Sequence, residues 1–211
     1  MNNPANYHTI NHPLLMEKLS HLMDECTSSP DFRRLTQEIS FLLTYEALRD
    51  WVTEKTKIST PNGTAVTPTL TNHPTVVSVL RGGNGMLPGV LEALPLAHVG
   101  HIGIYRDREL NSTIEYFLRL PDNAQDKPVL LLDPVIATGD TICASVSRLR
   151  KFGISDIRIL TILASEVGLK KLNATDDTVS VWGLRLAESL NQSGHLAPGP
   201  GDVSARFFNA S

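Results

Sequence analysis

The chain has 211 residues, of which 41% are hydrophobic and 19% charged, and its formal net charge is −3. This length supports one sizeable core, so we expect a single domain over residues 1–211. The charge gives no reason to expect nucleic acid or an anionic membrane as a partner, and no apolar run approaches the roughly 18 residues that span a bilayer. Neither Cys26 nor Cys143 has a metal or redox spacing, and the first residues do not resemble a signal peptide, so we expect a cytoplasmic protein.

The first quarter of the chain is predicted to be helical after a short irregular start. We expect residues 1–12 to form a loose arm and residues 13–52 to form N-terminal helices. Apolar residues recur at helical spacing in residues 14–23 and again in residues 32–51. The next segment, up to residue 60, is short and mixed, and the Pro-Asn-Gly sequence that follows it predicts a turn.

The remainder alternates between predicted strands and helices. Strands are expected at residues 76–80, 129–132, 157–164 and 179–183, and helices at 86–94, 142–152 and 166–172. Residues 99–105 and 114–120 alternate in polarity around a polar centre and predict a protruding β-hairpin. Strands that alternate with helices favour an α/β fold with a mainly parallel sheet flanked by helices. The segment 194–211 is a tail rich in Gly and Pro.

The segment Val129–Thr141, with the sequence VLLLDPVIATGDT, is typical of a phosphate site at the end of a buried strand. Backbone amides and threonine hydroxyls of Ala137, Thr138, Gly139, Asp140 and Thr141 can surround an anion where the next helix begins. The Asp140 carboxylate repels a phosphate unless its side chain turns outward. The alternative is an ordinary capped strand-to-helix turn. The lysine of a P-loop is missing, as is the three-glycine dinucleotide pattern.

Two strand ends carry side chains that could bind a ligand. Asp133 follows the apolar run directly, and a buried carboxylate there is costly unless it binds a metal or hydrogen-bond donors. The alternative is a carboxylate that caps nearby amides. Arg81 precedes the glycine-rich residues 82–85 and offers donors that suit phosphate oxygens. Together these strand ends predict a ligand with phosphate groups at two places.

Several motifs in order complete the pattern. They are the segments 32–35 and 43–47, the sequence LRGGNGM at residues 80–86, GHIGIYRD at 100–107, DPVIATGDT at 133–141, and PGPGD at 198–202. With these motifs, the chain resembles the uracil phosphoribosyltransferases, which have the type I phosphoribosyltransferase fold, from about residue 12 to residue 207.

The resemblance implies transfer of ribose 5-phosphate from phosphoribosyl diphosphate (PRPP) to uracil, giving UMP and diphosphate in pyrimidine salvage. By analogy, residues 137–141 hold the 5′-phosphate, Asp133 approaches the ribose, and Arg81 and Arg106 hold the diphosphate. Leu196, Gly201 and Asp202 would meet uracil. Asp133, Arg106 and Asp202 are the implied catalytic residues. Mg²⁺ would be held mainly through PRPP, near Asp133, rather than by a dedicated set of ligands. Family members are usually homo-oligomers, and GTP activates some relatives.

The sequence also departs from the family pattern. The Ala-Gly-Leu expected after Arg81 is Gly82-Gly83-Asn84, and the Gly-Gly-Ser of the phosphate loop is Gly139-Asp140-Thr141. The tail keeps only part of its base-side motif, and His195 replaces a tyrosine. Two alternatives therefore stay open: a non-catalytic protein that senses PRPP or nucleotides, and a phosphoribosyltransferase for a different base.

Overall fold

A seven-stranded sheet forms the centre of the molecule in the computed structural model, which describes residues 6–107 and 112–209, without the side chains of residues 106, 107 and 112. In spatial order its strands are β1 (Tyr7–Thr9), β11 (Ser180–Gly183), β9 (Ile157–Leu160), β7 (Val129–Leu132), β4 (Thr75–Leu80), β5 (His98–Asp107) and β6 (Ser112–Arg119). All neighbours are parallel except β5 and β6, which form an antiparallel pair. The predicted α/β fold with a mainly parallel sheet is thus confirmed.

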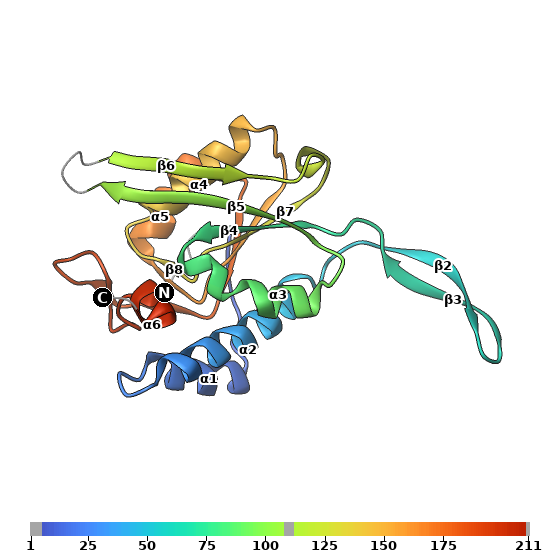
Figure 1. Cartoon of the computed structure of the whole chain (residues 1–211), viewed down its shortest axis with the longest axis horizontal. Helices are drawn as coiled ribbons and strands as arrows, with labels where there is room; N and C mark the ends of the chain where they lie inside the picture. Colours follow the sequence, from blue (N-terminus) through green and yellow to red (C-terminus); the bar gives the residue numbers. More distant parts are fainter. Residues whose placement is uncertain (1–5, 108–111, 210–211) are drawn as a thin grey trace.

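Both faces of this sheet are covered, which explains the unbroken apolar run of β7 (Figure 1). Leu130 and Leu132 pack in one hydrophobic cluster with α1 (Pro13–Met23), α2 (Ser29–Ala47) and α3 (Leu87–Ala93). Val129 and Leu131 pack in a second cluster with α4 (Asp140–Lys151) and α5 (Glu166–Thr175). A strand buried on both faces has no polar side to alternate with.

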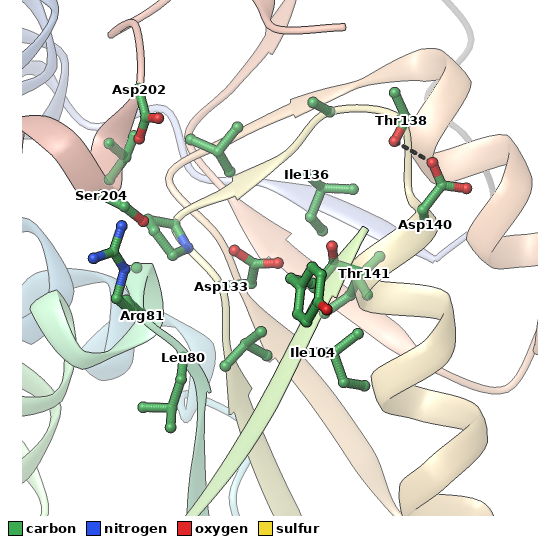
Figure 2. Close-up of a pocket in the computed structure, with 18 of the residues that line it drawn as sticks. Leu80, Arg81, Ile104, Asp133, Ile136, Thr138, Asp140, Thr141, Asp202 and Ser204 are labelled. Carbon is green, nitrogen blue, oxygen red and sulfur yellow. Dashed lines mark hydrogen bonds between the residues drawn. The ribbon is translucent and has the colours of Figure 1, made fainter. Parts of the chain in front are cut away.

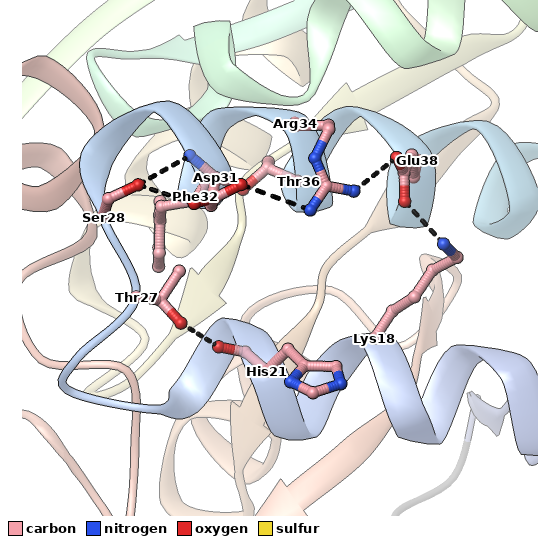
Figure 3. Close-up of polar contacts among 9 residues, drawn as sticks. All are labelled: Lys18, His21, Thr27, Ser28, Asp31, Phe32, Arg34, Thr36 and Glu38. Carbon is pink, nitrogen blue, oxygen red and sulfur yellow. Dashed lines mark hydrogen bonds and ion pairs between the residues drawn. The ribbon is translucent and has the colours of Figure 1, made fainter.

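The two N-terminal helices are joined by a network of side chains (Figure 3). Ser28 caps α2 by accepting a hydrogen bond from the amide of Asp31, at 3.3 Å. Glu38 pairs with Lys18 of α1 at 2.5 Å and with Arg34 of its own helix at 2.8 Å. The contacts help to fix the angle between the helices, although such exposed pairs contribute little stability.

Smaller elements surround the sheet. The parallel strands β8 (Val135–Ile136), β10 (Leu163–Ser165) and β12 (Arg185–Ala187) form a three-stranded sheet. The other short elements are the 3₁₀ turns η1 (Gly82–Gly85) and η2 (Ala124–Asp126), the antiparallel strands β13 (Ser189–Leu190) and β14 (Leu196–Ala197), and α6 (Val203–Phe208). Among the described residues, the structure contains no helix with the length and apolarity needed to cross a membrane.

The expectation of a loose arm over residues 1–12 is wrong for the described part of that segment. Residues 7–9 form β1, which pairs in parallel with β11 at one edge of the sheet. The Tyr7 side chain is buried, and the backbone amides of Ile10 and Val181 donate across this pair to Gly183 and Asn6. This strand has one buried side chain, that of Tyr7, and a single residue is too short a pattern to predict a strand from the sequence.

The expected helical region over residues 13–52 ends earlier, because α2 stops at Ala47. Residues 53–70 form a hairpin of β2 (Thr53–Thr60) and β3 (Gly63–Leu70), which extends far from the body of the protein (Figure 1). Almost all of its residues are exposed on both faces, so its sequence has no apolar alternation to reveal it. The predicted hairpin also exists, as β5 and β6, but its strands join the central sheet.

The predicted strand 157–164 is divided into β9 and β10, which belong to different sheets. Between them, the amide of Thr161 donates to Trp182, and the amides of Ile162 and Leu163 donate to Pro134. The chain thus exchanges one set of strand partners for another. All the residues concerned are apolar or buried, so the sequence pattern does not mark the change.

Candidate active site

A cavity of about 600 Å³ opens at the carboxyl ends of the central strands β4 and β7 (Figure 2). The ends of parallel strands are where ligands bind in open α/β sheets. The predicted site residues that line this cavity are Arg81, Asp133, Ala137, Thr138, Gly139, Asp140, Thr141, Gly201 and Asp202. They come from segments far apart in the sequence, so the fold brings most of the predicted site together.

The loop between β8 and α4 has the geometry of an anion site. Gly139 is the N-cap residue of α4 and adopts a φ of +83°, which favours glycine. A Cβ atom there would lie 2.8 Å from the carbonyl oxygen of Gly168 in α5. The first amides of a helix have no partners within the helix, so those that follow Gly139 are donors for an anion.

Asp133 lies at the centre of the cavity, directly after β7 (Figure 2). Burial raises the pKa of its carboxyl group to about 7, against the opposing effect of a hydrogen bond from the amide of Val135. A carboxyl group in this condition gains stability when a cation or a set of hydroxyl donors approaches it. Among the described residues there is no group of three His, Cys, Asp or Glu side chains that could hold a metal ion.

Arg81 stands at the end of β4, after a cis peptide bond with Leu80, and its guanidinium lies 5.9 Å from the ring of Phe208. The turn behind it is fixed by the buried hydroxyl of Ser78. That hydroxyl is 2.8 Å from Oδ1 of Asn84 and 2.7 Å from Nδ1 of His101. Asn84, which departs from the family pattern, thus stabilises the turn through its hydrogen bond with Ser78.

The part of the tail around Asp202 and Ser204 lies beside Arg81, on the side of the cavity opposite the loop of residues 137–141 (Figure 2). Asp202 caps α6, accepting a hydrogen bond at Oδ1 from the amide of Ala205 at 2.9 Å. Arg206 holds the tail to the N-terminal helices: its guanidinium donates to the carbonyl oxygens of Leu22 and Pro200 and lies 4.4 Å from the ring of Phe32.

Two predicted residues are not seen among the side chains that line the cavity. Leu196 is buried in the core, so only its backbone is left for a ligand. Arg106 belongs to β5, but its side chain lies outside the described residues. Sequence reasoning missed other lining residues, notably Tyr105, Tyr116, His195 and Ser204. Tyr105 lies in a family-like motif, Tyr116 in the predicted hairpin, and His195 and Ser204 in the tail, and these positions were the available signal.

The fold and the position of this cavity define a class of proteins. The adenine phosphoribosyl transferase from Trypanosoma brucei has a TM-score of 0.57 at 14% identity, covering 92% of this chain and 88% of that chain. At this identity the similarity shows a shared fold. The AQ2163 protein from Aquifex aeolicus has a TM-score of 0.91 at 30% identity, with 97% and 99% covered. The protein thus has the type I phosphoribosyltransferase fold.

Sequence comparison places the chain within that class. Residues 9–210 match the family model for uracil phosphoribosyltransferase. The uracil phosphoribosyltransferase of Clostridium beijerinckii is 36% identical over 200 residues, which are 94% of this chain and 96% of that protein. That of Legionella pneumophila is 38% identical over 200 residues, 94% of each. The chain belongs to the uracil phosphoribosyltransferase family, and its members are pentosyltransferases.

Proposed function

We propose that the cavity binds PRPP and uracil together and converts them to UMP and diphosphate. One observation carries this proposal: a helix-start anion loop, a buried carboxyl group and an arginine turn line the same cavity as the C-terminal tail. PRPP has phosphate groups on both sides of a ribose ring, and this order of groups along the cavity matches that chemistry. The family assignment supports uracil as the acceptor.

Each part of the cavity then has one role. The amides and hydroxyls of residues 137–141 bind the 5′-phosphate at the start of α4. The guanidinium of Arg81, with that of Arg106, binds the diphosphate. The carboxyl group of Asp133 binds the ribose hydroxyls. The backbone near Leu196 and Gly201, together with Asp202, forms the side that receives the edge of uracil.

The reaction breaks the bond from ribose C1 to the diphosphate oxygen and forms a bond from C1 to N1 of uracil. Positive charge develops on the ribose, and the ionised Asp133 carboxylate stabilises it, while Arg81 stabilises the negative charge on the leaving diphosphate. The N1 proton of uracil passes to Asp202, directly or through water. Its Oδ1 accepts from the amide of Ala205, so α6 orients the carboxylate for this task.

The residues present fit a magnesium ion carried by the substrate. Asp133 lines the cavity, and desolvation raises the pKa of its carboxyl group, so its charge is costly unless a cation lies nearby. Mg²⁺ carried in with PRPP would supply positive charge to the leaving diphosphate. Asp133 is the carboxylate we assign next to it.

We extend the proposal to a cytoplasmic homo-oligomer that acts in pyrimidine salvage. A GTP effector is a separate proposal, which rests on the family resemblance alone. Sedimentation of the purified protein, with and without GTP, tests whether it is an oligomer. An activity assay under the same conditions tests whether GTP is an effector.

The purified protein should be incubated with Mg²⁺, PRPP and one base at a time, using uracil, cytosine, adenine, guanine and hypoxanthine. We expect UMP and diphosphate from uracil alone. A nucleotide product from another base alone would favour a different base specificity. PRPP binding without a product from any base would favour the non-catalytic alternative. Either result would overturn the proposal.

A further inference from the structure

A carboxylate stands in the anion loop, where the family pattern has a glycine. Asp140 is the first residue of α4, and its side chain is only 15% exposed. Its Oδ2 accepts a hydrogen bond from the hydroxyl of Thr138 at 2.7 Å, so the carboxylate turns back toward the loop (Figure 2). An unpaired negative charge at this position would oppose a phosphate group bound to the same loop.

The charge of Asp140 is paired. Its Oδ1 accepts from the ammonium group of Lys171, which lies on the neighbouring helix α5. The thiol of Cys143, one turn further along α4, is in the field of both groups. Burial raises the pKa of that thiol, a hydrogen bond with Thr175 and the charge of Lys171 lower it, and the charge of Asp140 raises it. The ammonium group of Lys171 therefore lies at the start of α4.

The packing of α5 against the loop fixes this pair. A Cβ atom on Gly168 would lie 2.5 Å from the carbonyl oxygen of Ala137, so the two backbones are in close contact. Ser165 caps α5 by accepting from the amide of Gly168 at 2.9 Å, and its hydroxyl donates to the carbonyl of Ala137. Lys171 follows Gly168 by three residues, about one helical turn, which places its side chain on the face that meets the loop.

We propose that Lys171 is a positioning residue for PRPP, which neutralises Asp140 so that the loop can accept the 5′-phosphate. The proposal rests on the proposed function, because it places that phosphate at residues 137–141. The family pattern has a neutral glycine at position 140, whereas this chain has a carboxylate that is paired with Lys171. The positive charge of Lys171 acts through Asp140, so its effect on phosphate affinity depends on that carboxylate being present.

Two linked substitutions test the dependence. Lys171→Met removes a positive charge that pairs with Asp140 beside the phosphate, and we expect the KM for PRPP to rise several-fold. Adding Asp140→Asn removes the carboxylate but keeps an acceptor for Thr138, so the double variant should recover most of the lost affinity. Lys171→Arg keeps the charge and should stay near the wild type. The kcat at saturating PRPP and the KM for uracil should change little in Lys171→Met and Lys171→Arg, because Lys171 does not line the cavity.

Lys170→Met is the matched control, because Lys170 is the preceding residue on the same helix and pairs with Glu166, at 3.0 Å, outside the cavity. It should leave the KM for PRPP unchanged. Circular dichroism checks that each variant is folded. A Lys171→Met variant with the KM of the wild type would overturn the proposal. So would a double variant as weak as Lys171→Met, since that result means direct contact of Lys171 with phosphate.

Ribose 5-phosphate separates this proposal from the proposed function, because its binding requires no turnover. Titration calorimetry should show the same order of affinities: weak for Lys171→Met, largely restored in the double variant. Equal affinity in every variant would contradict the role of the pair, even if the protein makes UMP. Failure of the wild type to make UMP would contradict the proposed function alone, provided that the calorimetric order holds.

Discussion

Asp133 is the residue on which most of the proposed chemistry depends. It lies where the buried strand β7 meets the cavity, and burial holds the pKa of its carboxyl group near 7. Charge that is costly in the free protein becomes useful when a cationic ribose and Mg²⁺ enter the same space. The ionised Asp133 carboxylate therefore lowers the stability of the free protein but stabilises the transition state of the proposed reaction.

Substitution of Asp133 by Asn keeps the shape of the side chain and removes its charge. We expect kcat to fall at least about 100-fold, because a well-placed electrostatic group typically contributes a factor of this size. Steady-state assays of UMP formation measure the change, and circular dichroism checks the fold. Asp156→Asn, which changes an exposed carboxylate just before β9, is the control and should retain full activity. Normal turnover by Asp133→Asn would mean that this carboxyl group has no catalytic role.

Most of the candidate site could be predicted because its residues lie at strand ends that the hydrophobic pattern marks. Asp133 and the loop up to Thr141 follow the apolar run of β7, and Arg81 follows that of β4. Contacts between distant segments could not be predicted. The pairing of Asp140 with Lys171 needs the approach of α5 to the loop, and no local pattern encodes that approach.

At the scale of elements, two arginines hold the tail: Arg33 donates to the carbonyl oxygen of Phe207 at 2.9 Å, and Arg206 makes the larger set of contacts. Besides the bonds to Leu22 and Pro200, the guanidinium of Arg206 donates to the carbonyl oxygens of Asp24 and Thr27, between α1 and α2. Burial lowers the pKa of this guanidinium, against the effect of the Asp24 carboxylate, so its carbonyl partners are needed to hold it. The end of the tail is thereby fastened to the N-terminal helices.

Arg206→Met should release the tail while filling part of the same space. We expect the KM for uracil to rise several-fold while the KM for PRPP changes less, because the carbonyl partners of Arg206 lie in the tail and near the N-terminal helices and not in the loop of residues 137–141. Arg206→Lys should not rescue the effect, since one ammonium group cannot reproduce the planar set of donors. Substrate titrations in both directions give the two KM values. Equal increases in both would show that the tail does not act on the base side alone.

The hairpin of β2 and β3 is an element with little to hold it to the body. Its residues are nearly all exposed, and no third strand pairs with it in the part of the chain that the structure describes. In the isolated chain we expect the amides of residues 55–68 to exchange hydrogen rapidly, while those of β4 and β7 exchange only on global unfolding. Hydrogen–deuterium exchange with mass spectrometry measures both. Protection of the hairpin equal to that of β7 would contradict this expectation and indicate that a partner covers it.

The fold could be predicted as far as burial imposes a pattern on the sequence. β4, β7 and α4 are bounded almost as expected, because each has residues that pack against a core on a defined face. β1 and the β2–β3 hairpin were missed for opposite reasons. β1 has too few residues for a pattern, and the hairpin buries too little apolar surface to need one.

At the scale of the whole molecule, the buried carboxyl group of Asp133 links the site to stability. Its pKa is raised from 3.8 to about 7, so the folded protein binds a proton there that the unfolded chain has already lost. Folding stability therefore falls as the pH rises from about 4 to about 7, and the loss persists above that range. In the free protein, the ionised Asp133 carboxylate therefore lowers folding stability at the pH where the proposed reaction uses its charge.

Asp133→Asn should abolish this part of the pH dependence. We expect the melting temperatures of variant and wild type to be similar near pH 4, and the variant to melt roughly 8 °C higher near pH 8, because it avoids a charge costing on the order of 4 kcal/mol. Scanning calorimetry across that range measures the difference. Mg²⁺ and PRPP together should reverse the order at pH 8, since ligand binding stabilises the wild type more strongly. Parallel profiles without ligand would mean that Asp133 is already ionised at little cost, and its assignment as a strained receptor for positive charge would fail.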